Sequence, residues 1–249
     1  MPLVILATAY NTAYDTLYYS LSAISVLVLA YTMFLGLKKR HGLPDATSLN
    51  QAVGIALAAL GFAVSILAGV FLDTLMKRAI ITDLLYQQLH FPIFYIGVAL
   101  VLFGIDSSLL TAQKSIQSQS KKPGVKQLRI LQWGVFIVTI AIAVFYLLTL
   151  SVNPSQHVAQ QPVFFLPVIF VISIGIVELP ILAIMSRNSS LRKHLAWFSL
   201  SMFLIFVGAL REATIIPSSG EPWIDLLAAF GPFTAASFCL YMSTRSLKF

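Results

Sequence analysis

The sequence predicts an all-α, polytopic membrane protein with seven transmembrane helices, its N-terminus outside and its C-terminus in the cytoplasm. Three observations support this fold class: the composition, the spacing of the apolar runs and the placement of the basic residues. Hydrophobic residues make up 58% of the 249 residues and charged residues only 10%, whereas roughly a quarter of residues are charged in soluble domains. We therefore expect a multi-pass protein of the cell membrane.

The apolar runs have the length that a bilayer requires, because a transmembrane helix needs about 20 mostly apolar residues. Seven runs meet this condition, and together they predict one transmembrane domain over residues 1–249 with no soluble domain. The predicted helices cover residues 17–37, 52–72, 86–112, 130–152, 163–185, 195–216 and 223–242. The second is rich in Gly and Ala, which predicts close packing inside the bundle.

Local sequence signals mark the ends of the first and third predicted helices. The first carries no charge and stops at Lys38-Lys39-Arg40. No basic residue precedes it, so we expect a retained N-terminus near the outer interface rather than a cleaved signal. The third has Pro92 near its start, which suits the first turn of a helix. The polar residues 113–127 after it predict a solvated loop.

The last four predicted helices are separated by short polar segments. Residues 153–162 divide the fourth from the fifth, and the fifth contains Glu178 two residues before Pro180. The sixth and seventh are joined by the Pro- and Ser-containing residues 217–222, and the sixth carries the adjacent pair Arg211-Glu212.

The basic residues set the orientation. Of the 16 Lys and Arg residues, all except Lys77, Arg78 and Arg211 fall on one side of the seven predicted spans. That side is cytoplasmic by the positive-inside rule. Because the bases sit in short clusters between apolar runs, they indicate topology, and no nucleic-acid partner is expected. The expected partners are membrane lipid and either a protein partner or a second copy of the chain.

Ionisable residues inside the spans are the best pointers to function, because charge is costly among lipid tails. At the outer level we place Asp73, His90, Arg211, Glu212 and Asp225. Arg211 and Glu212 point about 100° apart on a helix, so each needs a partner from another helix. The alternatives for this group are snorkelling of Arg211 to the interface, a structural ion pair, or a ligand-binding pocket.

Two further acids lie nearer the cytoplasmic half. Glu178 beside Pro180 is typical of a proton path, and Asp106 lies at a similar level; a purely structural role for each is the alternative. His90 and His157 are the only weak haem candidates, because imidazole is a common axial ligand. No other cofactor and no metal site is predicted. Retinal is excluded, since no predicted span contains the Lys that a Schiff base needs.

No catalytic motif is present, and the single cysteine, Cys239, rules out an intrachain disulfide. The leading hypothesis is a non-enzymatic seven-helix protein, either receptor- or sensor-like or a membrane subunit of a larger complex, with a polar pocket in its outer half. The first alternative is a haem- or quinol-linked component of electron or proton transfer. The second alternative is a small proton-coupled transporter.

Overall fold

The structure, a computed structural model, describes residues 2–40, 46–117, 176–186, 188–212 and 221–247, together with single helical residues at 130, 133, 134, 137, 138 and 141. Most of the described residues are helical, and none of them belongs to a strand. The long helices are α1 (Pro2–Arg40), α2 (Ala46–Lys77), α3 (Asp83–Gln117), α6 (Ser189–Glu212) and α7 (Pro222–Ser246). All five are long and apolar enough to cross a membrane.

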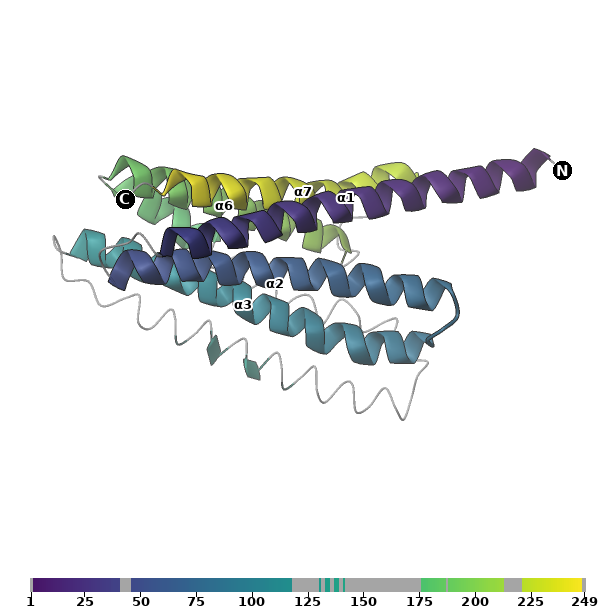
Figure 1. The fold of residues 1–249 in the computed structure, drawn as a ribbon, viewed down its shortest axis with the longest axis horizontal. Coiled ribbons are helices and arrows are strands. Elements are labelled where there is room, and N and C mark those ends of the chain that lie inside the picture. The colour runs from purple at the N-terminus through teal and green to yellow at the C-terminus, as the bar shows by residue number, and fades with distance from the viewer. Residues whose placement is uncertain are drawn as a thin grey trace.

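The helices lie side by side along the long axis of the molecule, and α1 occupies the middle of the arrangement (Figure 1). α1 packs against α2 on one side and against α7 on the other, while α2 pairs with α3 and α6 pairs with α7. Two helical hairpins are therefore joined through α1. The turn between α2 and α3 marks one end of the bundle, and the C-terminus lies toward the opposite end (Figure 1).

Two of the described helices, α3 and α6, begin before the predicted apolar spans because side-chain caps set their first residues. Thr82 Oγ1 accepts a hydrogen bond from the Leu85 amide at 3.2 Å, so α3 begins at Asp83. Asn188 Oδ1 accepts from the Ser190 amide at 2.9 Å and starts α6 at Ser189. Such side-chain caps satisfy amides that have no partner within the helix.

Two sequence expectations at helix ends are corrected by these boundaries. Pro92 lies inside α3 instead of in its first turn, because the Thr82 cap starts the helix much earlier. Residues 113–117 of the predicted loop belong to α3, and its remaining residues lie outside the described part of the chain. The N-terminal residues form the first part of α1, which begins at Pro2. A hydropathy window measures only the part of a helix that lies in hydrocarbon.

The prediction that the second apolar run forms a packed interior helix is confirmed. Ala58 and Ala59 are fully buried. A Cβ atom added at Gly104 of α3 would lie only 2.7 Å from the backbone oxygen of Gly54, so these two helices touch through their backbones. Small residues permit this close approach. The van der Waals contacts that result hold the two helices together in lipid, where the hydrophobic effect does not drive helices to associate.

The predicted fourth helix lies almost wholly outside the described residues. The described part of the predicted fifth is the short apolar helix Ile176–Met185.

At the same end of the bundle as the C-terminus, Lys39 of α1 donates a 2.7 Å hydrogen bond to the carbonyl of Thr244 near the end of α7. A lysine at this position satisfies carbonyl groups that the helix leaves without partners.

Candidate ligand-binding cavity

A cavity of about 410 Å³ opens between α1, α2, α3, α6 and α7 near the α2–α3 turn. Its size falls within the range of about 300–1,000 Å³ typical of small-molecule sites. Most of its lining is apolar: Phe62, Ile66, Gly69, Phe94, Val98, Val101, Leu102, Ile205, Ala209, Phe230 and Phe233. The polar and titratable side chains of the lining are Tyr14, Tyr18, Ser65, Asp73, Lys77, Tyr86 and His90.

Helical spacing explains how the sequence builds this lining. Residues four apart lie on one face of a helix, and the cavity residues of α3 include 86, 90, 94, 98 and 102. The cavity residues of α2 include 65, 69, 73 and 77 in the same spacing, and α1 adds 14 and 18. Each helix therefore turns one continuous stripe toward the cavity.

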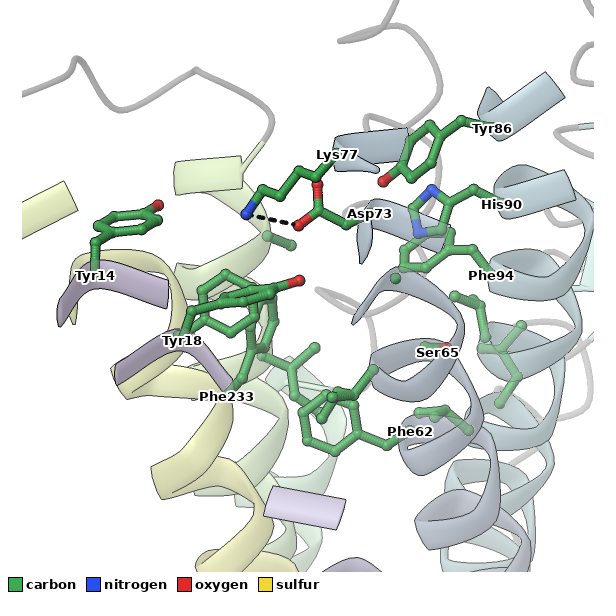
Figure 2. A pocket seen from close by; sticks show the side chains of 18 residues that line it. Tyr14, Tyr18, Phe62, Ser65, Asp73, Lys77, Tyr86, His90, Phe94 and Phe233 are labelled. Carbon is green, nitrogen blue, oxygen red and sulfur yellow. Dashed lines mark ion pairs between the residues drawn. The ribbon is translucent and has the colours of Figure 1, made fainter. Parts of the chain in front are cut away.

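Five of the seven polar side chains gather at one end of the cavity, while Ser65 lies nearer to Phe62, as Figure 2 shows. We call Tyr14, Asp73, Lys77, Tyr86 and His90 the polar end of the cavity. The rings of Phe62 and Phe233 lie at the other end (Figure 2). A cavity with this gradient suits an amphiphile, because a buried polar group needs a partner whereas a hydrocarbon segment needs only apolar contact.

Lys77 is the central charge of the polar end. Its ammonium lies 3.1 Å from an oxygen of Asp73, four residues earlier in α2, and 3.1 Å from an oxygen of Asp15 in α1. It also lies 5.3 Å from the centre of the Tyr18 ring. The group thus sits between two carboxylates and over an aromatic face, an arrangement that favours a cation.

His90 lies on the α3 side of the polar end. Its ring stacks on that of Tyr86, with centres 5.2 Å apart and planes 21° apart, and the Phe94 ring is 6.0 Å away. A Cβ atom added at Gly69 of α2 would lie 3.6 Å from His90 Nε2. Gly69 therefore leaves the space in front of the imidazole open.

Aromatic rings line the deeper part of the cavity. Tyr18 and Phe230 meet edge to face with their centres 4.7 Å apart. Phe62 and Phe233 meet at 5.9 Å, also edge to face. Such pairs pack rigidly and favour apolar ligand segments.

The outer-level residues named from the sequence divide between the cavity and an ion pair beside it. Asp73 and His90 line the cavity, while Arg211 of α6 forms an ion pair with Asp225 of α7, and neither of these two residues belongs to the lining. Asp225 is close enough to Tyr14 of the lining for the two side chains to interact electrostatically. The Arg211 side chain is only 9% exposed, so its guanidinium faces α7 instead of reaching alone toward the interface. Glu212 is the last residue of α6, and its side chain lies outside the described residues.

The other candidates lie elsewhere. Asp106 is buried and accepts a 2.6 Å hydrogen bond from Trp133 Nε1. Glu178 is close enough to Asp106 for the two acids to interact electrostatically, and within the described part of the chain its buried Oε1 has no hydrogen-bond partner. These acids do not line the cavity. His157 is outside the described residues.

Histidine also occurs at the far end of the bundle. His194 of α6 is fully buried, and Ser243 Oγ of α7 lies 2.7 Å from its Nδ1. Where the structure describes the chain, no group of three His, Cys, Asp or Glu side chains is arranged to hold a metal ion.

Sequence reasoning missed Lys77 and the tyrosines Tyr14, Tyr18 and Tyr86. The predicted second helix ends at residue 72, five residues before Lys77. The sequence signal for these residues is their spacing. The members of each pair lie four positions apart: Tyr14 and Tyr18, Asp73 and Lys77, and Tyr86 and His90. Reading that spacing beyond the apolar runs would have found the polar end.

Comparisons with known protein families, with characterised protein sequences and with solved structures find no match to this chain. The function is therefore inferred from the cavity itself.

Proposed function

We propose that the protein is a non-enzymatic, seven-helix integral protein of the cell membrane that binds a small amphiphilic molecule in the outer half of its bundle. It would act as a receptor- or sensor-like protein or as a membrane subunit of a larger complex. The observation that carries the proposal is the 410 Å³ cavity with its polar groups at one end and its aromatic rings at the other.

The seven spans combine the five long helices with the two apolar runs at residues 130–152 and 163–185. The orientation rests on the basic clusters. Those within the described residues lie at the end of α1, at the start of α6 and at the end of α7, and these helix ends face away from the α2–α3 turn (Figure 1). The positive-inside rule puts those clusters in the cytoplasm. The cavity, which lies near the α2–α3 turn, would then open in the outer half, where a ligand from the outer leaflet or the medium can reach it.

The absence of a recognisable catalytic motif in the sequence favours binding over catalysis. A binding protein of this kind needs an effector to pass its signal on. We therefore propose a protein partner or a second copy of the chain, in contact with the lipid-facing helices.

Photolabelling can test the binding proposal directly. The protein is reconstituted in phosphatidylcholine nanodiscs with a C16 alcohol that carries a diazirine in its chain, irradiated, digested and mapped by mass spectrometry. We expect saturable labelling of the cavity residues of α2 and α3. Labelling restricted to lipid-facing positions would overturn the proposal.

A matched pair of glycine variants makes this test specific. Gly69→Leu places a side chain in the cavity beside His90, where an added Cβ still has ordinary contact distance. Gly231→Leu adds the same side chain at a position of α7 with no atom within 4 Å of the added Cβ. Cavity labelling should fall severalfold in the first variant and persist in the second. Equal labelling in both would also count against the cavity.

A second candidate, proton-coupled transport, is favoured by Glu178 with its buried oxygen and its neighbour Asp106. An acid of this kind inside a span commonly marks a proton path. Proteoliposomes loaded with a pH-sensitive dye would show proton flux that Glu178→Gln abolishes and Glu221→Gln, an exposed acid, does not. Flux that is absent or insensitive to Glu178→Gln would dispose of this candidate.

Haem- or quinol-linked electron transfer is the alternative use of the same cavity, because His90 lies at its polar end. The visible spectrum of the protein purified from native membranes separates haem from the other proposals. A Soret band would favour a haem site, and a spectrum without one removes it.

A further inference from the structure

The cavity is long in the direction of the helix axes. Its lining on α2 runs from Phe62 to Lys77, which is about 22 Å at a rise of 1.5 Å per residue. Its lining on α3 covers a similar length, from Tyr86 to Leu102. A volume of about 410 Å³ spread along that length is slender. An extended hydrocarbon chain matches this space better than a compact ligand does.

Among the described residues, the charges at and beside the polar end are not balanced. Asp73, which lines the cavity, and Asp15, which lies beside the lining on α1, both pair with the ammonium of Lys77, so these three groups carry one negative charge in excess. Arg211 and Asp225 form a separate ion pair that is neutral as a unit. A ligand head with one positive charge would neutralise the polar end, whereas an anionic head would increase the repulsion.

The polar end also offers aromatic faces to a cation. The Lys77 ammonium already lies over the Tyr18 ring while it contacts the two carboxylates. The Tyr14 and Tyr86 rings line the same region (Figure 2). Aromatic faces together with carboxylates are the surroundings that bind substituted ammonium groups. The position of Lys77 thus shows that this end of the cavity accommodates an ammonium group.

We infer that the ligand is a cationic amphiphile with an ammonium head and a long hydrocarbon chain. The head lies at the polar end beside Asp73, and the chain extends between α2 and α3 toward Phe62 and Phe233. This inference rests on the proposed function and specifies the chemical class of its ligand.

The test compares three photoreactive probes that share one C16 diazirine chain and differ only in the head: an alcohol, a trimethylammonium and a sulfate. The protein is held in nanodiscs of zwitterionic phosphatidylcholine, so that lipid charge does not bias partitioning. The quantity measured is the probe mole fraction that gives half-maximal labelling of the cavity peptides. We expect the ammonium probe to label at the lowest mole fraction, roughly fivefold below the alcohol, with the sulfate weakest.

Acid-to-amide variants test whether this order of the three probes depends on the carboxylates at and beside the polar end. Asp73→Asn and, separately, Asp15→Asn should each remove most of the ammonium advantage while the alcohol probe labels as in the wild type. Glu221→Gln, an exposed acid at the same end of the bundle that does not line the cavity, should leave the advantage intact. Unchanged alcohol labelling shows that the variants retain the folded cavity.

The outcomes separate this inference from the proposed function. If the sulfate probe labels the cavity as well as the ammonium probe, or if both Asp variants keep the ammonium advantage, the inference is wrong although a binding cavity exists. If no probe gives labelling that Gly69→Leu reduces, the proposed function itself fails.

Discussion

The Lys77 ammonium of α2 donates a hydrogen bond to the Asp15 carboxylate of α1, with nitrogen and oxygen 3.1 Å apart, although the two residues are 62 positions apart in the sequence. This contact ties α1 to the α2–α3 hairpin beside the polar end of the cavity. Both side chains are 42% exposed, so water screens the pair and its contribution to stability is small.

Lys77→Gln should therefore separate stability from ligand preference. We expect a loss of less than about 1 kcal/mol in stability, because exposed ion pairs contribute little. We also expect the cationic C16 probe to label the cavity severalfold more strongly, since Asp15 and Asp73 lose the cation that partly neutralises them. Arg78→Gln, the neighbouring base that does not line the cavity, is the control. Weaker labelling by the cationic probe in Lys77→Gln would contradict the charge argument.

Arg211→Leu should destabilise the protein without affecting the cavity. The variant leaves Asp225 without the cation it pairs with in a contact that is mostly shielded from solvent. The expected cost is about 1–3 kcal/mol, measured as a lower midpoint of thermal unfolding in detergent. The double variant Arg211→Leu/Asp225→Leu should recover much of the loss. Because neither residue lines the cavity, C16 alcohol labelling of the folded protein should not change, and its loss would place Arg211 in the ligand site.

Gly97→Leu should disrupt the contact between α2 and α3. A Cβ atom added at Gly97 would clash with the backbone oxygen of Gly61 and with the side chain of Ser65. Overpacking of this kind costs about 1–3 kcal/mol or more when backbone atoms must move. Gly231→Leu, which meets open space, should melt within a few degrees of the wild type. Similar melting of the two variants would show that the backbones approach less closely than described.

Cysteine accessibility should report the orientation. In a Cys239→Ser background, Ile80→Cys places a thiol in the α2–α3 turn, where Ile80 is 62% exposed. A membrane-impermeant maleimide should label it in intact cells. Lys193→Cys, an exposed position at the opposite end of the bundle, should react only after permeabilisation. The reverse pattern would invert the topology and move the cavity to the cytoplasmic half.

Much of the helical scaffold was predictable, because apolar runs about 20 residues long have few alternatives in lipid. The five long helices overlap the predicted spans at residues 17–37, 52–72, 86–112, 195–216 and 223–242. Their ends were not predictable from hydropathy. Caps such as Thr82 and Asn188 act through one or two hydrogen bonds of a single side chain, and a hydropathy pattern does not detect them.

The candidate site was predictable only in part. Asp73 and His90 stood out as ionisable groups in apolar surroundings, and both line the cavity. Arg211 and Asp225 stood out for the same reason and instead pair with each other. The free-energy cost of burying a charge indicates that a charged residue needs a partner, but it does not identify that partner.

From the amino-acid sequence alone one obtains the membrane class, the approximate helices and the side that carries the basic clusters, since each of these depends on local composition. The order α3, α2, α1, α7, α6 and the cavity between these helices emerge only from the folded chain. The reason is that lining residues such as Tyr18, His90 and Phe233 belong to different helices. Their proximity depends on which small residues allow which helices to touch, and that information is not present in any single stretch of sequence.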